Sequence, residues 1–196
     1  MTCFLYAVRC NFARPDLEAE WNAWYSGAKL VEMLCKPHFL AVQRFAAVGL
    51  DQRRTYLALW CVASPDAFTS AEYRSDWGFF EWTPHIRDWS RDLYRAPVAA
   101  DDPVFAIGSA DALYFGAFDF MDAAAARTAL TRVRAQRPGV LWLEIAGLDR
   151  HAPILGVKKL SRSEPITPLA DAAGLVETVF APITPRFVAA AAMPTN

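Results

Sequence analysis

Lys36-Pro37-His38-Phe39-Leu40 and Arg137-Pro138-Gly139-Val140-Leu141 are the two stretches of sequence that decide the fold. In each, a run with helical spacing ends at a basic residue, a proline stops it, and a β-rich run follows. Pro138 stands roughly 100 positions after Pro37, which indicates two units with the same order of elements in one chain.

Around the first junction the pattern predicts a β-α-β-β-α-β unit. Phe4 to Arg9 is typical of a strand, and Pro15-Asp16 opens a helix that runs to about Lys36. Its apolar residues recur at steps of three and four, which predicts one face packed on a sheet. They are Leu17, Trp21, Trp24, Ala28, Val31 and Leu34. The remaining predicted elements are strands at 39–45 and 55–62, a helical region at 65–89 broken at 77–78 and at 84, and a strand at 93–95.

Around the second junction the same order recurs more weakly. The predicted elements are a strand at 113–118, a helix at 122–137, strands at 154–160 and 175–180 after the one that follows Pro138, and a stunted helix at 168–173. We therefore expect an α+β protein of two tandem ferredoxin-like units, whose antiparallel sheets pack face to face. The expected boundaries are 1–96 and 105–182 for the two units, 97–104 for a linker and 183–196 for a tail.

Composition excludes several classes of protein. The chain has 196 residues, of which 54% are hydrophobic, and a net charge of -1, so it is neither disordered nor a dedicated nucleic-acid binder. No apolar run is long enough for a membrane helix or a signal peptide, so we expect a cytoplasmic protein without membrane contact. The four cysteines form no zinc pattern and are expected as buried free thiols, and no metal site is predicted.

Aromatic residues are concentrated in the first unit, which holds six of the seven tryptophans. Its sequence resembles the dimeric α/β-barrel superfamily of ferredoxin-like proteins. The similarity lies in a helix with a Trp-Tyr pair (Trp24-Tyr25), a Pro-x-Phe turn (Pro37 to Phe39) and a strand that ends in an aromatic residue (Phe45). The resemblance implies a barrel-forming fold, and its members include cofactor-free cyclases, isomerases and lyases, antibiotic-type monooxygenases and, in tandem form, haem-binding chlorite dismutases.

Two residues depart from the family pattern. Many relatives have histidine where this chain has Lys29, and glycine where it has His38, so the family's usual base cannot be transferred. A side chain at a turn position that favours glycine is unusual because positive φ is costly for most residues, although histidine tolerates it better than most.

Histidine is the natural general base near neutral pH, and the chain has three. Helical spacing would place Glu81, Asp88 and Trp89 beside His85, where a carboxylate could orient the imidazole. His85 is therefore the first candidate catalytic residue and His38 the second. The alternative for His85 is a surface histidine in an ion pair, and the alternative for His38 is an exposed turn residue. His151, in a predicted loop, is expected to be solvated, with a haem ligand as the alternative.

The first helix and its neighbours supply the other candidates. Tyr25 and Lys29 are predicted to donate hydrogen bonds to a substrate oxyanion, although a polar stripe on a helix is more often its solvent face. The predicted substrate-binding residues are Trp21, Trp24, Trp82, Trp89, Arg44 and Asp88. Core packing is the alternative for the tryptophans, and a solvent or interface position the alternative for Arg44.

These observations predict a cofactor-independent lyase, isomerase or cyclase that moves a proton on a small or medium aromatic substrate, with no cofactor. The first alternative is a protein that binds an aromatic metabolite without catalysis. The second is a haem-dependent or antibiotic-type monooxygenase-like oxidoreductase. Edge strands left free by the two sheets predict a homodimer, with the barrel closed either within one chain or between chains.

Overall fold

The structure is a computed structural model that describes residues 3–50, 53–169, 172 and 174–190. In the first half, β1 (Cys3–Phe12) pairs with both β3 (Tyr56–Val62) and β4 (Ile86–Ala96), and β3 pairs with β2 (Phe39–Leu50). All of these pairs are antiparallel, which gives the strand order β4-β1-β3-β2. The predicted strands are confirmed, and β4 begins seven residues earlier than expected.

The second half has the corresponding order β6-β7-β5-β8. Its elements are β5 (Asp111–Phe118), α4 (Ala123–Gln136), β6 (Leu141–Leu148), β7 (Ile154–Ser161) and β8 (Leu175–Pro182). The predicted helix is confirmed, and it begins after Asp122, whose carboxylate accepts hydrogen bonds from the first free N–H groups. Residues 168, 169 and 172 are not helical, and the rest of the expected 168–173 helix lies outside the described residues.

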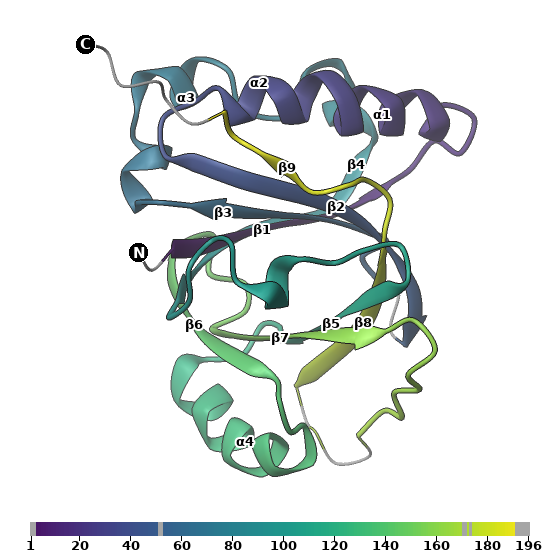
Figure 1. Cartoon of the computed structure of the whole chain (residues 1–196), viewed down its shortest axis with the longest axis vertical. Coiled ribbons are helices and arrows are strands. Elements are labelled where there is room, and N and C mark those ends of the chain that lie inside the picture. Colours follow the sequence, from purple (N-terminus) through teal and green to yellow (C-terminus); the bar gives the residue numbers. More distant parts are fainter. Residues whose placement is uncertain (1–2, 51–52, 170–171, 173, 191–196) are drawn as a thin grey trace.

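The two halves form one closed barrel, not two sheets stacked face to face (Figure 1). β4 pairs with β6, and β2 pairs with β8, so both edge strands of one half are hydrogen-bonded to the edge strands of the other half. The expectation of face-to-face packing was wrong because unpaired strand edges gain hydrogen bonds by joining. The barrel closes within one chain, so free edge strands no longer support the predicted homodimer, which stays a prediction.

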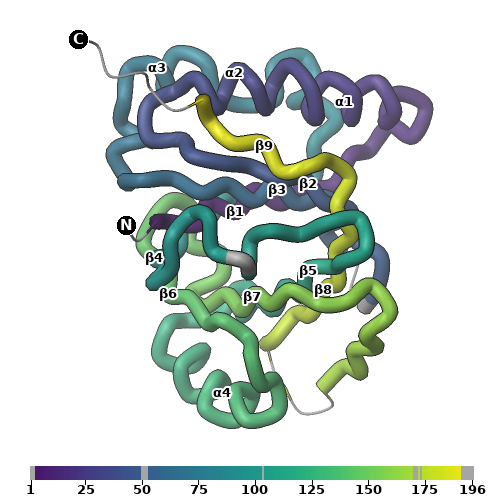
Figure 2. Tube along the Cα trace, in the orientation of Figure 1, coloured from purple at the N-terminus to yellow at the C-terminus, as the bar shows by residue number. Residues whose placement is uncertain are grey.

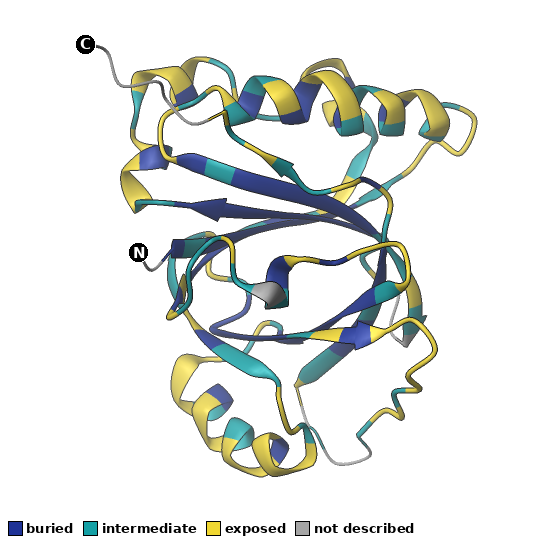
Figure 3. Ribbon diagram, in the orientation of Figure 1, coloured by how far each residue is buried: buried dark blue, intermediate teal, exposed yellow. Residues whose placement is uncertain are grey.

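The chain path is easy to follow in Figure 2, where the first half forms the upper part and the second half the lower. After β8 the chain returns to the first half, where the short strand β9 (Phe187–Val188) pairs with Ala41 and Val42 of β2. Figure 3 shows that the strands carry most of the buried residues, while the helices lie outside the barrel with one buried face.

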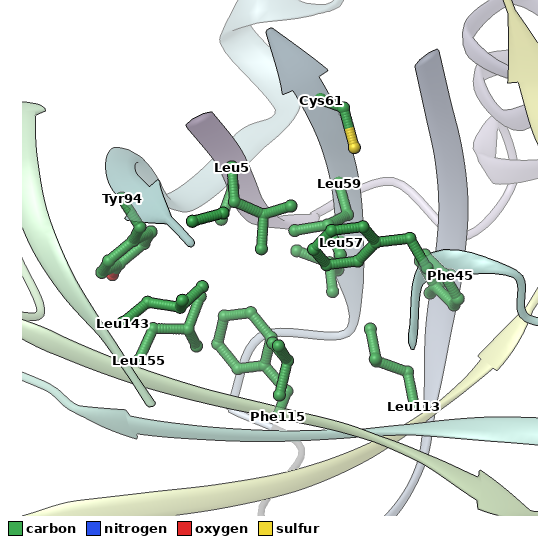
Figure 4. Packing of buried hydrophobic residues seen from close by; sticks show 14 of the residues in the cluster. Leu5, Phe45, Leu57, Leu59, Cys61, Tyr94, Leu113, Phe115, Leu143 and Leu155 are labelled. Carbon is green, nitrogen blue, oxygen red and sulfur yellow. The ribbon is translucent and has the colours of Figure 1, made fainter. Parts of the chain in front are cut away.

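Apolar side chains fill the barrel interior (Figure 4). Leu5, Leu57 and Leu155 are completely buried there, together with aromatic residues from both halves. The segment that was expected to be the linker contributes η4 (Pro103–Phe105) and covers one end of the barrel. Phe105 and Ile107 belong to the barrel core, and Gln43 donates a hydrogen bond to the Ile107 carbonyl at 2.8 Å.

The predicted first helix is one helical run with a wide turn in the middle. It consists of α1 (Glu18–Trp24), the π-helical turn η1 (Tyr25–Lys29) and α2 (Leu30–Leu34). A π-helical turn holds one residue more than an α-helical turn, so it rotates everything that follows. Ala28 and Val31, which were expected on the buried face, are therefore exposed, while Lys29 faces the sheet.

The expected helical region at 65–89 was wrong in its second part. It contains η2 (Pro65–Phe68), α3 (Ala71–Ser75) and η3 (Phe80–His85), but Asp88 and Trp89 lie in strand β4. Pro84 cannot continue an α-helical ladder, and β1 is long enough to pair with the chain that follows, from Ile86 onward. The helical arrangement of Glu81, Asp88 and Trp89 around His85 therefore does not exist.

Candidate functional site

A cavity of about 40 Å³ lies between the helical run and the outer face of the first-half sheet. We call it the helix–sheet cavity. Tyr25, Lys29 and Met33 line it from the helical run, and β1, β3 and β4 supply Tyr6, Val8, Trp60 and Trp89. Tyr73 and residues 77–79 close it. All of these residues belong to the first half, and most of the wall is aromatic.

Lys29 is the only lysine among the residues that line this cavity, and its side chain is 5% exposed. Its Nζ lies 3.4 Å from Glu32 Oε1 and 3.3 Å from the Asp76 carbonyl oxygen, and 4.4 Å from the centroid of the Phe80 ring. Burial lowers the pKa of Lys29 from its ordinary value, and Glu32 opposes that effect only in part. Burial therefore favours the neutral amine, which can accept a proton.

Tyr25 is buried one helical turn before Lys29 and lines the same cavity. Burial raises the pKa of its hydroxyl, so Tyr25 stays protonated and acts as a donor. The Arg44 guanidinium lies 4.2 Å from the centroid of the Tyr25 ring and fixes it from behind. Arg44 itself is held by Ser26 Oγ at 2.7 Å and by Asn22 Oδ1 at 2.9 Å, both on the helical run.

Two residues of the cavity wall carry a hydrogen-bond donor that lacks a partner in the described part of the chain. These donors are the buried indole Nε1 atoms of Trp60 and Trp89. Buried donors are normally satisfied. A ligand with an acceptor oxygen would satisfy them, and the aromatic wall suits a flat molecule.

Residues 76–80 separate this cavity from the outside. Trp77 stacks on Tyr73 and on Trp89, with ring centroids 6.1 and 5.9 Å apart, and Phe79 contacts Tyr25 edge to face. On the outer side of the same segment lies an apolar groove of about 440 Å³, also lined by Trp77, Phe79 and Trp89. Displacement of residues 76–80 would join the two spaces into one site large enough for an aromatic ring system.

The structure brings together three of the predicted site residues, Tyr25, Lys29 and Trp89, in the cavity wall. Arg44 contacts the cavity only through Tyr25. Trp21 and Trp82 are buried among other rings, and Trp24 packs on Trp82. These positions agree with core packing, the alternative given for the tryptophans.

The other predicted residues lie elsewhere. His85 packs edge to face against Phe12, with ring centroids 5.9 Å apart, and His38 is exposed in its turn at φ 69°. Asp88 is exposed and accepts a hydrogen bond from Asn11. None of the three lines the helix–sheet cavity. Of the cysteines, three are buried as expected, but Cys35 is exposed.

Sequence reasoning missed Tyr6 and Tyr73. Tyr6 and Trp60 face each other across the β1–β3 pair, and the Tyr6 and Tyr73 hydroxyls lie 3.4 Å apart. The available signal was the alternation of Tyr6, Val8 and Cys10 along β1, because alternate residues of a strand share one face.

Haem does not fit this site. No histidine lines the helix–sheet cavity or the groove outside residues 76–80, so neither offers an imidazole ligand to haem iron. Within the described residues, no group of three or more histidine, cysteine, aspartate or glutamate side chains is arranged to hold a metal ion. No described helix combines the length and apolar character needed to cross a membrane.

Solved structures share this architecture. An anthrone oxidase-like protein superposes with a TM-score of 0.60 at 12% identity, covering 98% of this chain and 97% of its own. A monooxygenase-like protein from Lactobacillus acidophilus NCFM gives 0.52 at 10% identity, covering 93% and 94%. A mutant chlorite dismutase from Candidatus Nitrospira defluvii gives 0.51 at 15% identity, covering 92% of each chain.

These similarities define the class of fold. The chain has the dimeric α/β-barrel fold that its sequence predicted, in a form where one chain supplies all eight strands of the barrel. No family model matches the sequence, and no curated protein matches it significantly. At these identities the likeness concerns the fold, and function has to be argued from the site.

Proposed function

We propose that the protein is an enzyme that removes a proton from a small aromatic substrate, bound in the site that the helix–sheet cavity and the outer groove form when residues 76–80 are displaced. The observation that carries this proposal is the pair of buried, unpartnered indole donors of Trp60 and Trp89, in a wall that also holds Tyr25 and Lys29. The substrate class is an aromatic molecule with an acidic C–H conjugated to a carbonyl. On deprotonation, its oxygen becomes the oxyanion that such donors stabilise.

Lys29 is the proton acceptor in this proposal, in place of the histidines. Its neutral amine takes the proton, and the lowered pKa brings that form closer to the working pH. Tyr25 and the two indoles hold the developing oxyanion, and Arg44 acts as a positioning residue for the Tyr25 ring. Residues 76–80 exclude water, which strengthens these interactions.

The fate of the carbanion separates two reaction types. Return of the proton from Lys29 to another carbon gives an isomerase, and attack of the carbanion on a carbonyl carbon of the same molecule, with the proton going to the new alkoxide, gives a cyclase. Reaction of the carbanion with O₂ instead converts a substrate CH₂ into C=O and releases one H₂O. The second reaction type is a candidate here because two proteins of similar structure are named as anthrone oxidase-like and monooxygenase-like. We further propose that the two halves are tandem ferredoxin-like units with the site in residues 1–96.

Anthrone is a suitable probe because it carries a methylene group activated by a carbonyl through its aromatic rings. Without O₂, the wild-type protein should accelerate exchange of the methylene protons in D₂O, followed by NMR. Lys29→Met should lower this acceleration by about 100-fold or more, the range of general base catalysis, and Tyr25→Phe by about 10-fold. Lys159→Met, which alters a partly exposed lysine in the second half, should have no effect.

Admission of O₂ then distinguishes the two reaction types, because only the oxidase type consumes O₂ and forms anthraquinone. Binding of anthrone without accelerated exchange would support the alternative of a non-catalytic binding protein. Accelerated exchange that survives in Lys29→Met would contradict the assignment of the base.

A further inference from the structure

The two ends of the barrel differ in how they are covered. One end is covered by the segment that contains Phe105 and Ile107. A second cavity, of about 220 Å³, lies away from this segment, and we call it the barrel-end cavity. Its wall includes Arg9 of β1, Phe115 of β5 and Phe180 of β8, which extend the rows of inward-facing residues.

Buried charges form one side of this cavity. Arg9, 3% exposed, donates two hydrogen bonds to Asp119, of 3.0 and 2.7 Å. Arg54 donates a third to the same carboxylate at 3.3 Å, so two guanidinium groups share one aspartate. Burial and the neighbouring charge of Arg9 both lower the pKa of Arg54. A second anion beside Arg54 would compensate that repulsion.

The polar side of the cavity is also incompletely hydrogen-bonded. Arg9 Nε and His151 Nδ1 are buried atoms without a hydrogen-bond partner in the described part of the chain, and Asp92 Oδ2 accepts no hydrogen bond there but lies 3.5 Å from Arg9 Nη2. Asp92 lies behind the wall, where its Oδ1 accepts a hydrogen bond from the His151 backbone N–H at 2.8 Å. Unsatisfied polar atoms of buried charged groups are costly, and their concentration at one cavity points to a ligand.

Aromatic rings of the cavity wall lie beside these guanidinium groups. Phe115 lies 5.3 Å from the Arg9 guanidinium, Phe120 lies 5.7 Å from that of Arg54, and Trp89 and Phe180 complete the wall. Phe120 is 76% exposed, a large fraction for a phenylalanine, and it also contacts the His151 ring edge to face. Aromatic faces beside guanidinium groups suit a ligand that is flat at one end and anionic at the other.

We propose that the barrel-end cavity is a binding site for a small aromatic carboxylate. Its carboxylate pairs with Arg54 and its ring lies among Phe115, Phe120 and Trp89. This site is distinct from the helix–sheet cavity, with which it shares only Trp89. The proposal therefore does not depend on the catalytic role of Lys29.

The experiment uses benzoate as the probe and benzyl alcohol as its uncharged analogue, with binding followed by calorimetry and by the indole N–H resonances. Benzoate should bind at least about tenfold more tightly than benzyl alcohol. It should shift the Trp89 resonance and leave that of Trp60 unchanged, because Trp60 lines only the helix–sheet cavity.

Arg54→Gln should weaken benzoate binding at least about tenfold. Arg132→Gln, at an exposed arginine of α4, is the matched control and should not change it. Val176→Trp, which fills the cavity from the partly exposed start of β8, should abolish binding and serves as the test if Arg54→Gln fails to fold. Equal affinity for the two probes, no benzoate binding at millimolar concentration, or a shift of Trp60 would each overturn the proposal.

Discussion

Lys29→Met tests the physical basis of the proposed function through stability alone. The substitution keeps the apolar stem and removes the ammonium group. Without the ammonium, the chain loses a charged hydrogen bond to the Asp76 carbonyl, worth about 1.5 kcal/mol. It also loses a pair with the partly exposed Glu32, worth about 0.5 kcal/mol, and the interaction with the Phe80 ring, worth about 0.5 to 1 kcal/mol.

These interactions together contribute about 2.5 to 3 kcal/mol, but dehydration of the ammonium group costs several kcal/mol. The lowered pKa of Lys29 indicates that the dehydration cost is the larger of the two. We therefore expect Lys29→Met to be as stable as the wild type at pH 7, or more stable by up to about 2 kcal/mol.

The pH dependence gives the same test a second readout. A lysine whose pKa is lowered in the folded state releases its proton earlier than in the unfolded state. Its burial cost therefore disappears as the pH rises through the window between the lowered pKa and the ordinary value of 10.5. The free energy of unfolding of the wild type should therefore rise with pH over that window because of Lys29, and the Lys29→Met variant should lack this rise.

Urea unfolding followed by tryptophan fluorescence, at pH 7 and in the alkaline window, measures both effects. Lys36→Met is the contrasting variant, because Lys36 donates a 2.8 Å hydrogen bond to the Glu72 carbonyl but does not line the cavity. It should lose about 1 to 2 kcal/mol. A loss of more than about 2 kcal/mol in Lys29→Met would refute the reasoning, because the ammonium would then be stabilised by its partners.

Three further substitutions test the fold. Gly156→Ala should lower the free energy of unfolding by about 1 to 3 kcal/mol, because its Cβ would lie 2.5 Å from the Trp142 ring; an unchanged urea midpoint would contradict this packing. Asp122→Ala should cost about 1 kcal/mol by removing the cap of α4, whereas Asp122→Asn should cost less in the same assay. Leu5→Ala in the barrel core should cost about 2 to 5 kcal/mol, and a loss below about 1 kcal/mol would show that this position is not closely packed.

The sequence predicted the order of strands and helices along the chain well where local signals were strong. Pro37 and Pro138 end their helices as expected, and Asp122 caps α4, because these effects depend on residues close in the chain. The closure of the barrel could not be predicted in this way. It depends on pairing between β4 and β6 and between β2 and β8, which are distant in sequence.

The candidate site was predicted only in part, and the reason is local geometry. Tyr25 and Lys29 were identified as a polar stripe, but a regular helix would have left them beside the buried face. The π-helical turn brings Lys29 into it, and no residue pattern signals that turn. The histidine hypothesis relied on helical spacing after Pro84, where the chain instead pairs with β1 as a strand.

The indole N–H resonances of the seven tryptophans show whether the helix–sheet cavity is the substrate site. With anthrone as ligand, we expect shifts for Trp60 and Trp89, whose unpartnered Nε1 atoms line the cavity. Trp142 is the internal control, because its Nε1 is equally buried and unpartnered but lies in the second half. A shift of Trp142 without Trp60, or bound anthrone that leaves Trp60 unchanged, would mean that the substrate binds elsewhere.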